Sequence, residues 1–372
     1  MSGVPTIPRF GAIFALAFLP LAGLAAAMPA AGGPPVTQQV QADFEGLFAN
    51  DVTLTQTSLG YSQKRRSAEW SASLAWNSYR LDYVPAPFDF LGLRESVDAH
   101  RVAGQLGGKI KILDPLAAVF SVGAYDGFTD FRSLWLNQYY RQQFAAFFPE
   151  YIRASPKGEN GTVGLRWEYL PTVGFLQADV SYLHDEIAPG YEIDFAGLRR
   201  GRPNLYTASY HVSAENVLTR RVRLLNEFRL TDTTDREQRY SWQGSLNVAL
   251  GESWIVRAFG GWTQEDPTFE AWYGGGSVEF EPAPGWHFSV SGRWYRDTGE
   301  IENSLFSNAA PGLEAWQVGL GVRRVWGAHS IKVFAAPYQT RYEPFGIGTA
   351  FFQNLYKDRS WLAVQLAYSA EF

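Results

Sequence analysis

The chain of 372 residues contains no cysteine and only two methionines and five histidines. The absence of cysteine excludes disulfides, thiolate metal sites and a cysteine nucleophile. No long run of lysine and arginine marks a nucleic-acid-binding surface, and the net charge is only -5. Beyond the amino terminus no apolar run reaches the roughly 18 residues that a spanning helix needs, and mean hydropathy is -0.18. A helical membrane protein is therefore excluded.

The amino terminus has the features of a secretory signal peptide. Arg9 supplies positive charge, the apolar stretch "FGAIFALAFLPLAGLAAA" follows, and Ala25 and Ala27 form a small-x-small cleavage site. We predict a signal peptide over residues 1–27, with an N-terminal membrane anchor as the alternative. Residues 28–50 are rich in Ala, Gly, Pro and Gln, which predicts a flexible periplasmic linker.

From residue 51 onward, apolar and polar residues alternate, which is the pattern of half-buried β-strands. In "YSWQGSLNVAL", Tyr240, Trp242 and Leu246 fall on one face, and Ser241 and Gln243 fall on the other. Short turns alternate with long loops along the chain, which is typical of outer-membrane barrels. The pattern predicts an all-β fold, a closed antiparallel transmembrane β-barrel over residues 51–372.

Strand counting gives sixteen strands, with fourteen as the alternative. Seven short turns join fourteen strands, and a first strand near 51–62 and a last near 360–372 complete the set. One of the seven turns is placed at Asn77-Ser78, because the apolar parity changes there. A single bulged strand is the other interpretation of that segment.

Tryptophan spacing indicates two aromatic girdles. Trp254 and Trp262 lie eight residues apart, as do Trp286 and Trp294, which we assign to the next, adjacent strand. Eight residues of a strand tilted by about 40° rise about 20 Å along the membrane normal, close to the apolar band of about 25 Å. A soluble β-sandwich is the alternative.

The last residues, "LAVQLAYSAEF", alternate apolar side chains and end on an aromatic residue. In this the chain resembles Gram-negative outer-membrane β-barrels of the porin type. The resemblance implies that Tyr368 and Phe372 form the signal that the barrel-assembly machinery recognises. It also implies location in outer-membrane lipid, short turns on the periplasmic side, and a homotrimer as a possible assembly.

If the tryptophan face meets lipid, the opposite face lines the lumen. The strand parity puts Arg80 and Asp82 there, and the pore-lining candidates are Arg101, Lys109, Lys111, Arg166, Glu168, Arg223, Glu227, Arg229, Arg257, Arg293, Arg323 and Lys332. Cations outnumber carboxylates, which predicts a mild anion preference. The alternative is that these residues form structural pairs across strands, for example Glu227 with Arg257 or Arg166 with Asp179.

The longest loop, about residues 127–160, follows the fifth predicted strand and contains an amphipathic stretch. In sixteen-stranded porins the loop at this place folds into the lumen. The resemblance implies that Arg132, Arg141, Glu150 and Arg153 lie at a constriction, and an external lid is the alternative.

The sequence carries no motif for catalysis, cofactor binding or metal binding. His211 with Ser213 and His287 with Ser289 share a strand face, but i and i+2 side chains are about 6.5 Å apart. We expect no enzyme activity, no cofactor and no metal. The predicted function is a channel for passive diffusion of small hydrophilic solutes. An outer-membrane hydrolase and a plugged structural or adhesion barrel are the alternatives.

Overall fold

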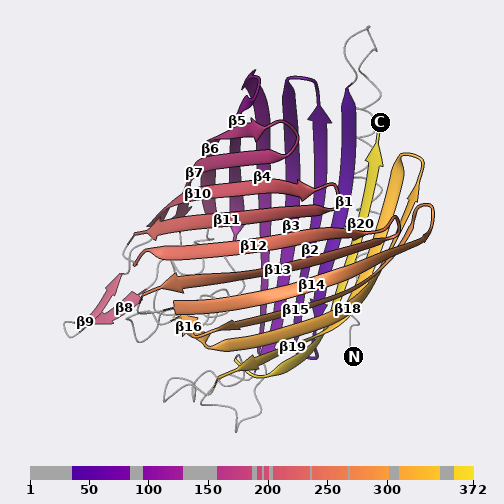
Figure 1. Ribbon diagram of the computed structural model, residues 1–372. Coiled ribbons are helices and arrows are strands. Elements are labelled where there is room, and N and C mark those ends of the chain that lie inside the picture. The colour runs from indigo at the N-terminus through magenta and orange to yellow at the C-terminus, as the bar shows by residue number, and fades with distance from the viewer. Residues whose placement is uncertain are drawn as a thin grey trace.

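The computed structural model describes residues 36–83, 95–128, 157–186, 191–194, 197–200, 204–234, 237–266, 269–300, 310–343 and 356–372. Sixteen antiparallel strands close into one barrel (Figure 1). They are β1 (Thr37–Phe48), β2 (Val52–Lys64), β3 (Ala68–Tyr83), β4 (Glu95–Leu113), β5 (Leu116–Gly127), β6 (Lys157–Leu170), β7 (Gly174–Glu186), β10 (Asn204–Thr219), β11 (Val222–Thr233), β12 (Arg239–Leu250), β13 (Trp254–Glu265), β14 (Phe269–Ala283), β15 (Trp286–Asp297), β18 (Leu313–Trp326), β19 (His329–Tyr342) and β20 (Arg359–Glu371).

The connections differ at the two ends of the barrel. At one end, which we call the short-turn end, the strands are joined by two or three residues, and β1 begins and β20 ends there. The opposite, loop end carries all the long connections. Two of these contain small two-stranded sheets, β8 (Tyr191–Asp194) with β9 (Gly197–Arg200) and β16 (Gly299–Glu300) with β17 (Ala310–Pro311). No helix in the described part of the chain could span a membrane.

The predicted count of sixteen is correct, but two of its parts are wrong. The segment expected to be a linker contains β1, which pairs with both β2 and β20 and so closes the barrel. The barrel therefore begins at Thr37 rather than at residue 51. No turn exists at Asn77-Ser78, because β3 is continuous and pairs without a register shift from Ala68 to Tyr83. The turn that was missed lies at residues 65–67.

The change of apolar parity in β3 has a physical cause other than a turn. Trp70, Trp76 and Arg80 lie on one face of the strand, and Tyr79 and Leu81 lie on the other. Nearest the short-turn end the outward side is apolar. Past Trp76 the outward side becomes charged, while Tyr79 and Leu81 pack inward at 5% and 1% exposure. The pattern inverts because the strand leaves the lipid and its inner side becomes packed. Arg80 and Asp82 are therefore outward, and their assignment to the lumen was wrong.

The strands are strongly staggered around the barrel. A row of inter-strand partners starts at Thr37 in β1, passes through Asp179 in β7 and Arg229 in β11, and reaches Asp297 at the loop end of β15. The row thus runs from one end of the wall to the other. A stagger of this kind requires tilted strands, as closed barrels have, and the tilt is visible in Figure 1.

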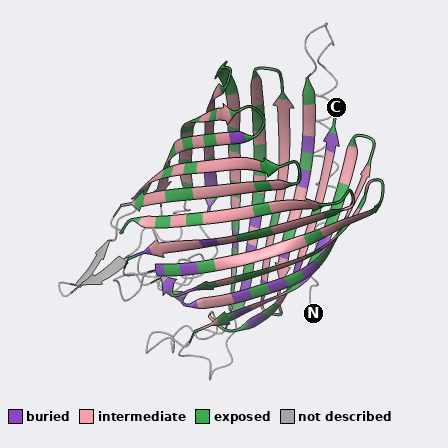
Figure 2. Ribbon diagram, viewed as in Figure 1, coloured by how far each residue is buried: buried purple, intermediate pink, exposed green. Residues whose placement is uncertain are grey.

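Outward side chains form an apolar band between tryptophans. Toward the loop end, Trp242, Trp262 and Trp272 are direct cross-strand neighbours, and Trp294 pairs with Trp316. Toward the short-turn end, outward tryptophans include Trp254 of β13 and Trp286 of β15, which β14 separates, so the prediction that they stand on adjacent strands was wrong. Large apolar side chains between the two levels are exposed, and Figure 2 shows exposed residues distributed along the strands of the wall. Outward charges such as Arg296 and Glu314 appear two residues beyond the upper tryptophans. The outer surface therefore has the dimensions and chemistry of a lipid-facing belt.

Candidate solute pathway inside the barrel

Side-chain contacts that skip a strand identify the inner face. Arg166 of β6 reaches Glu215 of β10 across β7, with 3.3 Å between the guanidinium and carboxylate atoms. Tyr273 of β14 donates a hydrogen bond of 2.8 Å to Gln243 of β12 across β13. Side chains two strands apart converge on the concave side of a curved sheet and diverge on the convex side. These residues therefore point into the lumen, and the tryptophan face points outward.

The strand register assigns the same inner parity to all twelve pore-lining candidates. They are Arg101, Lys109, Lys111, Arg166, Glu168, Arg223, Glu227, Arg229, Arg257, Arg293, Arg323 and Lys332. The four constriction-loop candidates, Arg132, Arg141, Glu150 and Arg153, lie outside the described residues. The long loop that carries them does follow the fifth barrel strand.

Between the charged residues, the inner face consists largely of small polar side chains. One row of cross-strand partners contains Ser62, Ser71, Ser121, Thr162 and Ser181. Ser209 and Thr231 continue the row. Hydroxyl groups both donate and accept hydrogen bonds and occupy little space. This wall can replace part of the hydration shell of a passing solute.

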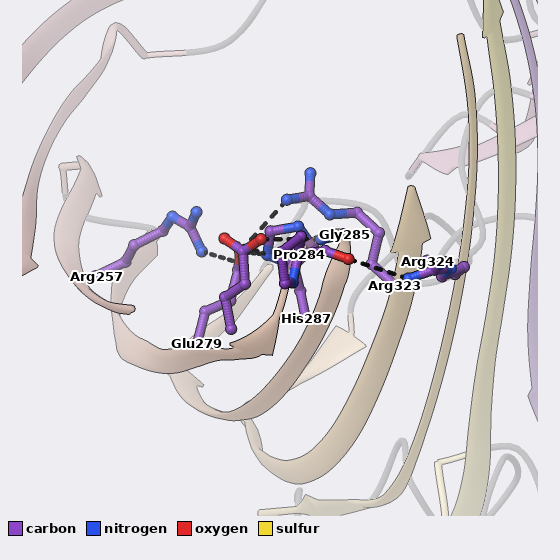
Figure 3. A network of polar contacts seen from close by, with 8 residues as sticks. Arg257, Glu279, Pro284, Gly285, His287, Arg323 and Arg324 are labelled. Carbon is purple, nitrogen blue, oxygen red and sulfur yellow. Dashed lines mark hydrogen bonds and ion pairs between the residues drawn. The ribbon is translucent and has the colours of Figure 1, made fainter. Parts of the chain in front are cut away.

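A charged cluster around Glu279 lies near the short turn at residues 284–285. The Glu279 carboxylate accepts a hydrogen bond of 3.0 Å from Arg257 and lies 3.5 Å from Arg323 and 3.2 Å from His287 Nδ1 (Figure 3). Glu281 lies 3.9 Å from the same imidazole and accepts a hydrogen bond from the Gly285 backbone N–H. The side chain of Glu279 is only 14% exposed, so the carboxylate that the two arginines share is largely buried.

A second cluster, around Glu215, lies at a similar depth. Its carboxylate is shared by Arg166 and Arg223, one from each side. The Arg166 guanidinium also lies 4.5 Å from the centre of the Phe175 ring, a cation–π contact. Again two cations share one carboxylate, which the protein holds largely buried.

A third cluster is built from lysines. Glu69, the second residue of β3, lies 3.2 Å from the ammonium group of Lys64 and 3.5 Å from that of Lys109. It therefore repeats the arrangement of two cations around one carboxylate. The three carboxylates stand on β3, β10 and β14, so the clusters are distributed around the circumference of the short-turn mouth.

Three further inner cations form no ion pair within the described strands: Arg229, Arg293 and Lys332. All three side chains are exposed, and the Arg293 guanidinium lies 5.6 Å from the centre of the Tyr338 ring. The specific pairs that were considered are wrong. Arg257 pairs with Glu279 rather than Glu227, and Arg166 pairs with Glu215 rather than Asp179, because the register brings those carboxylates closer.

Both histidine–serine pairs turn their imidazoles toward carboxylates. His211 Nδ1 lies 3.0 Å from Asp179 Oδ2 and Nε2 lies 3.7 Å from Glu227, while His287 contacts Glu279. In the part of the chain that the structure describes, no group of three or more His, Asp or Glu side chains could hold a metal ion.

Several inner charges were not predicted from the sequence. Asp43 and Glu45 stand on β1, which was assigned to the linker, and Lys64 and Glu69 flank the turn that was not found. The alternation in "QVQADFEGLF" was the available signal. Its outward side contains Ala42 and Gly46, which weakens the apolar pattern.

No model of a known protein family matches the chain, and no curated protein matches it. Among solved structures, the chain is similar to CdiB from Acinetobacter baumannii, with 9% identity and a TM-score of 0.52 over 91% of this chain and 60% of that chain. It is also similar to a bacterial polysaccharide outer membrane secretin, with 7% identity and a TM-score of 0.51 over 90% of this chain and 98% of that one. The fold is that of an outer-membrane β-barrel. The chain spans about three fifths of the CdiB chain, and at these identities the likeness establishes the fold alone.

Proposed function

We propose that this barrel is a passive, water-filled channel of the outer membrane for small hydrophilic solutes. The observation that carries the proposal is the polarity of the inner wall. Along the sixteen strands, hydroxyl, amide and charged side chains point inward, and the apolar side chains that alternate with them point outward. A wall of this kind stabilises hydrated solutes in the barrel and needs no turnover chemistry.

A mild preference for anions is the second part of the proposal. Each of the three clusters at the short-turn mouth gathers two cations around one carboxylate. Arg229, Arg293 and Lys332 add positive charge that no described carboxylate neutralises. Asp43 and Glu45 oppose this on β1, so the expected preference is small.

Further parts of the proposal concern export and assembly. A signal peptide over residues 1–27 would direct the chain to the periplasm. Phe372 and Tyr368 would then present the last strand to the barrel-assembly machinery. Tyr368 faces outward on β20, and the Phe372 backbone exchanges hydrogen bonds of 2.8 and 3.1 Å with Gln38 of β1. A homotrimer is the assembly that porin-like barrels suggest.

Single-channel recording in planar bilayers tests the proposal. Purified full-length protein should give discrete conductance steps in KCl. In a tenfold KCl gradient, the sign of the reversal potential should show that chloride is more permeant than potassium. Protein that inserts, shown by protection from protease, and yet conducts no current would overturn the channel and favour a plugged barrel.

A further inference from the structure

The inner wall from β1 to β5 is hollowed beside the short-turn mouth. A cavity of about 530 Å³ opens there, within the range of roughly 300–1,000 Å³ usual for small-molecule sites. Trp70 and Phe120 line part of it, and the lining residues with hydroxyl, amide or charged groups are Thr37, Gln39, Ser62, Gln63, Lys64, Glu69, Ser71, Ser73, Gln105, Lys109 and Ser121. Gly107 deepens the cavity, because a Cβ atom there would lie 3.3 Å from the Ser71 hydroxyl oxygen.

The Glu69 cluster differs from the other two in ways that favour a ligand. Its carboxylate is 37% exposed, against 15% for Glu215 and 14% for Glu279. Its cations are lysines, whose ammonium groups sit on flexible stems and can turn toward a new partner. Lys64 and Lys109 are 69% and 40% exposed. This cluster is thus open and adaptable where the arginine clusters are held by a buried carboxylate.

We propose that this cavity binds polyhydroxylated carboxylates of the size of a sugar acid. The inference deepens the proposed function, because the ligand reaches the cavity through the lumen. Lys64 and Lys109 offer two positive charges to the carboxylate of the ligand. Ser71, Ser73 and Gln105, all exposed, can donate to and accept from neighbouring hydroxyls of the ligand. The Glu69 carboxylate can accept a hydrogen bond from a further hydroxyl, so the site recognises charge and hydroxyls together.

Isothermal titration of the full-length protein in detergent micelles tests this without any need for conductance. The probes are D-glucuronate, D-glucose, which has the hydroxyls without the charge, and acetate, which has the charge without the hydroxyls. Glucuronate should bind about tenfold more tightly than either, the ratio expected for about 1.4 kcal/mol of additional interaction.

Two variants and a matched control locate the site. The double variant Lys64→Gln/Lys109→Gln should weaken glucuronate binding at least tenfold, and Ser71→Ala/Ser73→Ala should weaken it several-fold with little effect on acetate. Lys332→Gln removes one positive charge near the short-turn end of another wall segment, as each half of the double variant does, and should change the affinity less than about twofold. Two measurements verify that each variant is folded: its circular dichroism spectrum, and its resistance to unfolding in detergent that has not been heated.

The outcomes separate this inference from the channel proposal. Equal binding of glucuronate and acetate, or an equal loss in Lys332→Gln, would overturn the sugar-acid site and leave conductance unaffected. Glucuronate binding without conductance in bilayers would support the site and overturn the passive channel. Conductance without glucuronate binding would support the passive channel and overturn the sugar-acid site.

Discussion

The two faces of one strand, β15, have different surroundings: one belongs to the apolar outer band and the other faces the lumen. Phe288 and Val290 point outward, and Val290 is 52% exposed in the apolar band. Ser289 and Ser291 alternate with them and point into the lumen. The backbone is the same for both sets, so the difference between neighbours is one of side-chain environment alone. In a barrel wall, the parity of a position determines what a substitution costs.

The largest expected effect is a charge placed on each face in turn. Val290→Arg puts a guanidinium in the middle of the lipid band and should destabilise the folded barrel by about 3 kcal/mol. Ser291→Arg, one residue later, should cost less than about 1 kcal/mol, because the lumen of the proposed channel is filled with water. Urea titration of protein refolded into phospholipid vesicles measures both. Equal costs would mean that β15 does not have a lipid face and a water face.

A smaller effect concerns the loop end, where the inner wall is packed rather than open. Asp51, in the turn between β1 and β2, accepts two hydrogen bonds of 3.1 Å from Arg359 and lies 2.7 Å from Lys357. Burial opposes ionisation of Asp51, but the bonds from Arg359 and Lys357 outweigh it and hold the pKa of this carboxyl below its usual 3.8. Asp51→Asn should therefore destabilise the barrel by about 2 kcal/mol at pH 7.

The pH dependence of that variant follows from the direction of the shift. A lowered folded-state pKa gives stability that is present above the unfolded pKa and is lost as the pH falls through the folded one. The difference between wild type and Asp51→Asn should therefore shrink from pH 5 to pH 2. Glu69→Gln at the open mouth should cost under about 1 kcal/mol. If Glu69→Gln costs more than Asp51→Asn, the contrast between packed and open ends is wrong.

A gain of about 1 kcal/mol is expected where a polar side chain faces lipid. Asn226 points outward between Leu224 and Phe228, with Ala214 and Gly244 as cross-strand neighbours. Asn226→Leu should stabilise the barrel, because it removes an amide from the apolar band. Gln243→Leu, on the inner side of the adjacent strand, should destabilise it by losing the bond from Tyr273. Unfolding in urea gives both signs, and a loss of stability in Asn226→Leu would contradict the outward assignment.

The smallest effect is on ion selectivity. A unit charge about 10 Å from an ion in water contributes about 0.4 kcal/mol, or about twofold in relative permeability. Arg229→Gln should lower the chloride-to-potassium permeability ratio by about that factor, measured from reversal potentials in a KCl gradient. Asn226→Leu is the control, since it changes only the outer surface and should leave the ratio unchanged.

Alternation and turn chemistry were enough to predict the barrel and its C-terminal strand, and the strand number was right because the missed β1 and the false division of β3 cancelled. They failed where hydrophobicity does not report the environment. In β3 the outward side becomes charged beyond Trp76 because the strand projects past the lipid. In β1 the outward residues include Ala42 and Gly46, and the segment resembled a linker. Both errors arise because apolar alternation reports the surroundings of the side chains and does not report directly whether the backbone forms a strand.

The inner clusters were only partly predictable. Parity placed Arg166, Arg257 and Arg323 on the inner face, but their partners depend on register and on wall curvature. Glu215 receives Arg166 from two strands away, and nothing in the local sequence gives that distance. The cavity beside Glu69 is lined by residues of five strands, so it becomes visible only in three dimensions.

The seam between β1 and β20 sets a condition on biogenesis. The first and the last strands of the barrel are the ones that must meet, so a chain lacking only the thirteen residues of β20 has two unsealed margins instead of none. A shorter chain with the same strand pairing but without β20 is therefore an open sheet and not a smaller closed barrel. The sheet can therefore be sealed only after β20 has been synthesised, in whatever order the other strands pair.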